Sequence, residues 1–251
     1  MRSTQIYIST IASDGAEAAR KYGLGLEIAE YCTAWNMDTR YEETNALVQR
    51  KLSGIQNRVL HAPFNELFPC AIDPKARELA ASRYRQAIQI AKCCAAAKVV
   101  IHGGYNPRIY YPCWYTEQSV LFWRSFLTED PGVEIVLENV LEEEPEMLLN
   151  IVKEVDDPRL RICLDVGHVN AYSQIPADSW LKVCAPYLLH FHIHNNDGSW
   201  DTHSALDQGS IPMERLLNLA SRLCPDATFT LELMESESSI RWLLDQGILE
   251  N

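Results

Sequence analysis

The sequence predicts a single-domain α/β fold, a (β/α)8 barrel over residues 1–251, and three observations support this prediction. Eight short, mostly apolar segments have the composition of strands, and each is followed by a helix or a helix-sized segment. Apolar strands that alternate with helices form a parallel sheet with helices on both faces. Eight such units in 251 residues have the size of one closed barrel, and no linker-like composition separates a second domain.

The first four βα units follow one another from the N-terminus. Their strands are short apolar runs, expected at residues 5–9, 25–29, 58–61 and 99–102. Their helices are expected at residues 14–22, 46–56, 74–97 and 116–127. Gly23 ends the first helix, and Pro74 stands in the first turn of the third, where proline is tolerated. Two polar and aromatic segments, 31–43 and 103–115, are expected to be loops.

The second half of the chain repeats the same order. Its strands are expected to end at residues 138, 165, 192 and 232, each after an apolar or mostly apolar run. Its helices are expected at residues 145–155, 177–184, 213–223 and 238–246. His168 follows the second of these strands by three residues and is expected in a turn.

Composition and charge exclude several classes of protein. The formal net charge is −12 and no basic run is present, so no nucleic-acid partner is expected, because duplex binding needs clustered Lys and Arg. No stretch approaches the roughly 18 apolar residues of a membrane span, so no membrane partner is expected. The eight cysteines form no CxxC pair and the N-terminus lacks an export signal, which predicts reduced thiols in a cytoplasmic protein.

Potential metal ligands gather where the predicted strands end. Six strands end in such a residue: His61, His102, Glu138, Asp165, His192 and Glu232. His168 follows in a turn, and Asp201 and His203 lie in the loop after the seventh strand. The strand ends of a barrel meet at one mouth, whereas an open, doubly wound sheet could not bring six of them into one cleft. Imidazole and carboxylate groups together suit zinc, manganese, cobalt or iron, and nine such ligands could hold one to three ions.

The histidines support this pattern as a group rather than singly. All seven fall at predicted strand ends or in the loops that follow, although one such histidine alone would more often be a satisfied core or surface residue. His190, His192 and His194 alternate along one strand, so all three face the same way. His190 is expected deeper in the barrel and His194 at its rim. Which of the three binds metal stays open from the residues alone.

Seven short motifs together resemble a known superfamily. They are His61-Ala-Pro-Phe, Ile101-His-Gly-Gly, Leu137-Glu-Asn, Cys163-Leu-Asp-Val-Gly-His, His190-Phe-His-Ile, Asp201-Thr-His and Leu231-Glu. This combination is similar to the xylose isomerase-like TIM-barrel superfamily, which includes sugar and sugar-phosphate isomerases and epimerases and the endonuclease IV-like proteins of AP endonuclease family 2. The resemblance covers essentially the whole chain.

The resemblance implies a metal site, residue by residue. Four residues match the metal site of the epimerases: Glu138, Asp165, His192 and Glu232. Five more match the additional ligands of the trinuclear zinc endonucleases: His61, His102, His168, Asp201 and His203. The chain departs from the endonucleases in its acidic charge, in lacking basic DNA-binding loops, and in the run Glu142-Glu-Glu144. The implied cofactor is one to three divalent ions of manganese, zinc or cobalt.

The implied function is that of a metal-dependent sugar or sugar-phosphate isomerase or epimerase in carbohydrate metabolism. A divalent ion chelates a carbonyl and a neighbouring hydroxyl and stabilises the enediolate that forms when the α-proton leaves. Glu138 and Glu232 flank the substrate, so that one removes a proton and the other returns one. His168 orients a substrate oxygen. Partners are then a small sugar or sugar phosphate, and a homo-oligomer is left open.

Three other interpretations remain open, and the first two use the same residues. A multinuclear zinc phosphodiesterase of endonuclease IV type would activate a bridging water for attack on a small diester. A keto-sugar or cyclitol lyase is a further alternative within the superfamily. A non-enzymatic barrel would replace the four matching ligands by apolar residues, and none of them is replaced.

The loops offer candidate substrate contacts. Arg108 is a candidate for an anionic end group of the substrate. Tyr105, Trp114 and Trp200 are candidates to wall the pocket, although aromatic side chains in loops also pack on the loop itself or form oligomer contacts. Asn139 and Asn170 are candidates to support the site.

Overall fold

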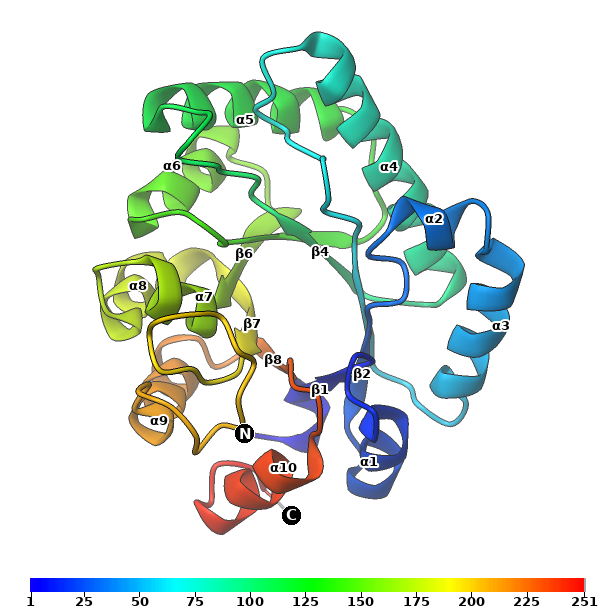
Figure 1. Ribbon diagram of the computed structural model, residues 1–251, viewed down its shortest axis with the longest axis vertical. Helices are drawn as coiled ribbons and strands as arrows, with labels where there is room; N and C mark the ends of the chain where they lie inside the picture. The colour runs from blue at the N-terminus through cyan, green and yellow to red at the C-terminus, as the bar shows by residue number, and fades with distance from the viewer. Residues whose placement is uncertain (251) are drawn as a thin grey trace.

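A computed structural model describes residues 1–250 and shows a closed barrel of eight parallel strands, so the predicted (β/α)8 TIM barrel is confirmed (Figure 1). The strands are β1 (Ile6–Ser9), β2 (Gly25–Ile28), β3 (Arg58–His61), β4 (Lys98–His102), β5 (Glu134–Glu138), β6 (Leu160–Asp165), β7 (Leu188–Ile193) and β8 (Thr228–Leu231). Each strand pairs with its neighbours in sequence, and β1 closes the barrel on β8, where Ile8 pairs with Leu231.

Helices form a ring around the barrel (Figure 1). The α-helices are α1 (Gly15–Tyr22), α2 (Ala34–Met37), α3 (Tyr41–Leu52), α4 (Pro74–Cys93), α5 (Pro112–Phe126), α6 (Pro145–Val155), α7 (Val166–Tyr172), α8 (Ala177–Cys184), α9 (Met213–Leu223) and α10 (Glu237–Asp245). Two 3-10 helices, η1 (Ser3–Gln5) and η2 (Ala185–Tyr187), precede β1 and β7. Within residues 1–250, no helix has the length and apolar character needed to cross a membrane.

The strands carry two apolar layers on their opposite faces. The larger layer lies between the sheet and the helices and includes Ile8, Leu60 and Ile101. The smaller layer fills the inside of the barrel with Tyr7, Val59, Val100, Val136 and Cys163.

The predicted ligands continue the inner layer. Successive side chains of a strand alternate between its faces, so a residue two positions after an inner residue also points inward. Four ligands stand in this relation to an inner apolar residue: His61 to Val59, His102 to Val100, Glu138 to Val136 and Asp165 to Cys163. The alternation that builds the inner core therefore also directs the ligands into the barrel mouth.

Two expected loops contain helix. In the segment 31–43, the Thr33 hydroxyl accepts a hydrogen bond from the backbone of Asn36 and starts the short helix α2, and α3 begins at Tyr41 rather than at residue 46. In the segment 103–115, Pro112 occupies the first turn of α5, so Trp114 is helical.

Two other boundaries also differ from expectation. Helix α4 ends at Cys93 rather than at residue 97, because the backbone of Ala95 has a left-handed φ of 52°. The expected turn after β6 is the short helix α7, which begins because the Asp165 carboxylate accepts a hydrogen bond from the backbone of His168 at 2.7 Å. His168 is therefore held on a helix rather than on a turn.

Candidate metal centre

The carboxylate of Glu138, at the end of β5, is the centre of a cluster of imidazoles. The Glu138 side chain is almost fully buried, and four histidines from four different elements surround it. The distances from the Glu138 oxygens are 3.1 Å to Nε2 of His61, 3.2 Å to Nδ1 of His192, 3.4 Å to Nε2 of His102 and 3.4 Å to Nδ1 of His168.

The four residues matched to an epimerase-type metal site are brought together. One ligand atom from each of Glu138, Asp165, His192 and Glu232 lies within 4.8 Å of the others. Nδ1 of His192 lies 3.3 Å from a Glu232 oxygen and 3.8 Å from an Asp165 oxygen. Three carboxylates thus lie close together, and among residues 1–250 their ion-pair partners are histidines and not Lys or Arg. A divalent cation fits a donor set of this kind.

A second group of ligands shares Glu138. His61 and His102 offer nitrogen atoms within 4.8 Å of the same carboxylate. The two rings meet edge to face, with centroids 5.1 Å apart, and Phe64 stacks on His102 at 4.3 Å. Glu138 could therefore bridge two metal ions.

A third group is centred on Asp201, in the loop after β7. Its carboxylate lies 3.1 Å from Nε2 of His203 and 3.3 Å from Nε2 of His168. His194, which was expected at the rim, is fully buried and lies 3.5 Å from Asp201. These facing atoms, Nδ1 of His194 and Oδ1 of Asp201, are buried and make no hydrogen bond in the described chain, and a metal ion between them would satisfy both.

Backbone carbonyl groups orient three of the histidines. Nδ1 of His61 donates to the carbonyl of Ala62, Nδ1 of His168 to that of Asn139 and Nδ1 of His203 to that of Glu232, all within 2.9 Å. A histidine ligand whose second nitrogen is fixed in this way keeps its tautomer and its ring orientation. In each of the three rings, Nε2 is left to face a carboxylate of the centre.

The loop that carries Asp201 is held in shape by Asn195. The Asn195 side chain donates to the carbonyls of Leu206 and Ile211 and accepts from the backbone of Ile211, and its backbone pairs with Ser204. At Gly209 a side chain would clash, because a Cβ atom would lie 2.2 Å from the Asn195 amide oxygen. His203 has a left-handed φ of 48°, a strained conformation that the rest of the loop maintains.

Of the two asparagines predicted to support the site, Asn139 contacts a ligand residue and Asn170 contacts the loop after β7. The Asn139 side chain donates to the carbonyl of Asp165 and accepts from its backbone NH, at 3.0 and 2.9 Å. The Asn170 amide donates to the side chains of Asn196 and Ser210, at 2.6 and 2.9 Å. Asn139 therefore fixes the end of β6, and Asn170 ties α7 to the loop after β7.

Of the candidate substrate contacts, one lies beside the centre, and among residues 1–250 the structure gives the other three no contact with it. Trp200 is 66% exposed and meets Tyr172 edge to face, and the Tyr172 ring lies 6.1 Å from that of His168, so Trp200 lies beside the centre. Tyr105 is buried against Tyr115, and the indole nitrogen of Trp114 donates to the carbonyl of Cys70. Arg108 is exposed, and the structure gives it no contact with the centre.

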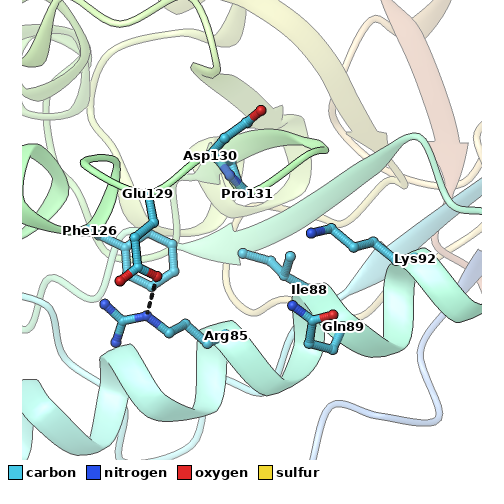
Figure 2. A pocket seen from close by; sticks show the side chains of 8 residues that line it. All are labelled: Arg85, Ile88, Gln89, Lys92, Phe126, Glu129, Asp130 and Pro131. Atoms are coloured by element: carbon cyan, nitrogen blue, oxygen red, sulfur yellow. Dashed lines mark ion pairs between the residues drawn. The ribbon is translucent and has the colours of Figure 1, made fainter.

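A hollow on the outside of the barrel takes no part in this centre. It has a volume of about 80 Å³ and lies between α4 and the segment after α5, where Arg85 pairs with Glu129 at 3.7 Å (Figure 2). Arg85 also lies over the Phe126 ring at 5.1 Å. None of the predicted ligands lines this hollow.

The sequence matches a known family over most of its length. The family described as xylose isomerase-like TIM barrel matches residues 16–246. The chain belongs to this family. The uncharacterized protein MJ1311 of Methanocaldococcus jannaschii is 32% identical over 190 residues, which are 69% of this chain and 63% of that protein. The match thus spans less than two thirds of the length of that relative.

Solved structures of the same architecture are more distant in sequence. A D-tagatose 3-epimerase-like protein superposes with a TM-score of 0.79 at 24% identity, over 98% of this chain and 97% of that one. The TTHB071 protein from Thermus thermophilus, soaked with ZnCl2, superposes with a TM-score of 0.77 at 24% identity, over 99% and 100% of the two chains. These likenesses show the fold.

One buried carboxylate of this xylose isomerase-like barrel was not predicted from the sequence. Glu27, in β2, is fully buried and accepts hydrogen bonds from His190, His192 and Thr230. An acidic residue in the middle of the apolar run Gly25-Leu-Glu-Ile28 was the available signal, because charged residues are rarely buried without partners.

The protonation of the metal-free centre follows from burial and pairing. Burial alone would raise the pKa of Glu138, but His192 and His102 hold it well below the ordinary value. Burial alone would lower the pKa values of His168 and His203, but their carboxylate neighbours raise them to about 10 and about 9. Burial lowers the pKa of His102 to about 4. Without metal, protons on His168 and His203 therefore balance the carboxylates.

Proposed function

We propose that this protein is a divalent-metal-dependent isomerase or epimerase of sugars or sugar phosphates. The convergence of Glu138, Asp165, His192 and Glu232 within 4.8 Å carries the proposal. Membership of the xylose isomerase-like family and the likeness to a structure described as epimerase-like support it. The proposed cofactor is manganese, zinc or cobalt, with one to three ions per chain.

The four converging residues would hold the first ion. Their donor set of one imidazole and three carboxylates suits a divalent ion of borderline hardness. When bound, such an ion supplies Lewis acidity toward a carbonyl and its neighbouring hydroxyl. His61 and His102 would share Glu138 with a second ion, and Asp201, His203, His168 and His194 surround the place for a third.

We assign the exchange of a proton with the substrate to two carboxylates, Glu138 and Glu232. The Glu232 side chain is 14% exposed and that of Glu138 is 1% exposed, so Glu232 is the one more open to the mouth. A proton removed at a carbon next to the carbonyl and returned to the opposite face of that carbon gives epimerisation, and return to the neighbouring carbon gives isomerisation. Where no third ion is bound, we assign to Nε2 of His168 the donation of a hydrogen bond to a substrate oxygen, because Nδ1 is already bound to the Asn139 carbonyl.

A zinc phosphodiesterase is the second candidate, and the Asp201 group favours it. His194, Asp201 and His203 form a group that could hold a third ion, and several ions together suit in-line attack on a phosphate diester. The substrate would be a small diester, given the net charge of −12. A lyase acting on a keto-sugar or cyclitol would use the same proton transfer as the isomerase.

Metal content and solvent exchange together test the proposal. The protein is purified without tag or chelator, its metal is counted by plasma mass spectrometry, and ketoses and ketose phosphates are incubated with it in D2O. We expect at least one manganese, cobalt or zinc per chain and deuterium at the carbon next to the carbonyl. Two or three zinc ions with cleavage of bis(p-nitrophenyl) phosphate and no exchange would favour the phosphodiesterase. Failure to bind any of these metals after reconstitution would overturn both.

A further inference from the structure

Beneath the metal centre, the barrel contains a second layer of polar side chains, centred on Glu27. This carboxylate is fully buried, and among residues 1–250 its partners are side chains of β7 and β8 rather than Lys or Arg. The partners are Nε2 of His192 at 3.0 Å, Nε2 of His190 at 3.1 Å and the hydroxyl of Thr230 at 2.7 Å. A buried carboxylate needs such donors, because an unpaired buried charge is strongly destabilising.

His192 lies between Glu27 and the metal centre. Its Nε2 faces Glu27, while its Nδ1 faces Glu138 and Glu232 at 3.2 and 3.3 Å. A carboxylate accepts but does not donate, so each nitrogen of His192 carries a proton in the metal-free protein. A metal ion replaces one of these protons, and Nδ1 is the nitrogen that faces Glu138 and Glu232, while Nε2 keeps its proton toward Glu27. His61, His168 and His203 are oriented by backbone carbonyls, whereas a charged side chain orients His192.

Neighbours below Glu27 fix the second histidine that faces it. Two residues earlier in β2 stands Gly25, where a Cβ atom would lie 2.4 Å from the Tyr7 ring, so that ring closes the space below Glu27. The Tyr7 ring meets His190 edge to face, with centroids 6.1 Å apart, and Nδ1 of His190 contacts the hydroxyl of Thr228 at 2.6 Å. The second histidine that faces Glu27 is thus fixed by neighbours of its own.

We infer that Glu27 is a positioning residue: it fixes the tautomer and the ring orientation of His192 and thereby keeps Nδ1 available to the metal centre. This inference rests on the proposed metal-dependent function. Partners that orient a histidine ligand typically change metal affinity by about 10- to 100-fold when they are removed. Glu27 itself contacts neither substrate nor metal in this role.

Two substitutions at Glu27 separate positioning from packing. Glu27→Met keeps most of the volume but removes the acceptor, and Glu27→Gln keeps one acceptor oxygen without the charge. The matched control is Glu142→Met, because Glu142 is also a buried carboxylate but accepts from Tyr115 and the backbone of Val140 instead of from a ligand. Zinc affinity is measured by competition with a fluorescent chelator, and the melting temperature of the metal-free protein is measured alongside.

We expect Glu27→Met to weaken zinc binding by about 10- to 100-fold, with Glu27→Gln intermediate. Glu142→Met is expected to lower the melting temperature but to leave zinc affinity within about twofold of the wild type. Equal zinc affinity in Glu27→Met and the wild type would overturn the inference. An equal loss in Glu142→Met would also overturn it, because the effect would then be one of packing.

A second measurement needs neither metal nor a variant. With 15N-labelled histidine, the Nε2 proton of His192 is expected as a slowly exchanging, downfield NMR signal in the metal-free wild type. Its absence would overturn the inference. If the wild type bound no metal but showed this signal, the proposed function would fail while the orientation of His192 by Glu27 would stand. If Glu27→Met does not fold, this signal in the wild type and the zinc affinity of Glu27→Gln test the inference instead.

Discussion

The two glutamates of the centre differ in their access to the mouth. Glu138 is in contact with four histidines and is 1% exposed, whereas the Glu232 side chain is 14% exposed and has fewer partners. Removing the charge of Glu138 therefore takes a partner from four histidines, whereas removing that of Glu232 takes a partner from two, His192 and His203. Glu232 is the better residue with which to separate proton transfer from assembly of the whole centre.

We predict that Glu232→Gln lowers the rate of solvent exchange into a ketose substrate by about 100-fold or more, since a positioned general base contributes about that much. Bound metal, counted by plasma mass spectrometry, is expected to decrease less than the rate. Glu235→Gln is the matched control, because Glu235 lies in the same loop and is exposed to solvent. A rate for Glu232→Gln close to that of Glu235→Gln would contradict a role in proton transfer.

The candidate ligands could be predicted from the sequence where they stand at the ends of strands. The residues from His61 to Glu232 lie together because the barrel brings strand ends together. Glu27 was missed because an acid within a strand gives no clue to its partners, and His190 and His192 come from a strand far away in sequence. The role of His194 was missed because three histidines on one face cannot be ranked without the depth of each in the barrel.

At the scale of elements, the loop after β7 carries Asp201 and His203, and Asn195 fixes its shape. Asn195→Ala removes the hydrogen bonds to Leu206 and Ile211, so the third group of ligands should loosen while the first keeps its geometry. We predict that the weakest-bound zinc is lost, with an affinity decrease of at least about tenfold, while the tightest-bound zinc is unchanged. Isothermal titration resolves the two.

Asn65→Ala is the control for this variant, because Asn65 is exposed in the loop after β3. A uniform loss at every zinc site in Asn195→Ala would show that the loop supports the whole centre rather than one part of it. A titration identical to that of Asn65→Ala would show that the loop needs no such support.

Helices and strands were predicted where the apolar pattern is strong. They were missed where a single capping residue determines whether a short helix forms. All eight strands were predicted because an apolar run between helices has few other interpretations. The helices α2 and α7 were missed because each is a short helix started by one hydrogen bond, from the backbone NH of Asn36 to Thr33 and from that of His168 to Asp165. Such bonds depend on the φ and ψ of one residue, which residue spacing does not specify.

At the scale of the molecule, metal and protons compete for the centre. In the metal-free protein, His168 and His203 have pKa values of about 10 and about 9, above the ordinary value of 6.5. Their contribution to stability is complete below pH 6.5 and is lost as the pH rises through 9 to 10, because the folded state then binds more protons than the unfolded state. Metal must displace these protons, so its binding strengthens over the same range.

We therefore predict that the increase in melting temperature on zinc loading is larger at pH 8.5 than at pH 6.5. Each protonated histidine contributes at most about 1.4 kcal/mol per pH unit to the slope of the metal-free protein. Differential scanning calorimetry with and without zinc measures both slopes. His203→Asn, which tolerates the left-handed backbone, should flatten the metal-free curve. Parallel curves for the two forms would contradict proton displacement.

The alternation of inward and outward side chains along the strands limits which insertions and deletions the chain can tolerate. His61, His102, Glu138 and Asp165 each stand two residues after an inner core side chain. The loss or gain of one residue ahead of such a pair would turn its core side chain and its ligand outward together, so the packing of the inner core also keeps the ligand position directed into the barrel. Asp201 and His203 lie on a loop between β7 and α9, so their direction is not coupled to the inner core in this way.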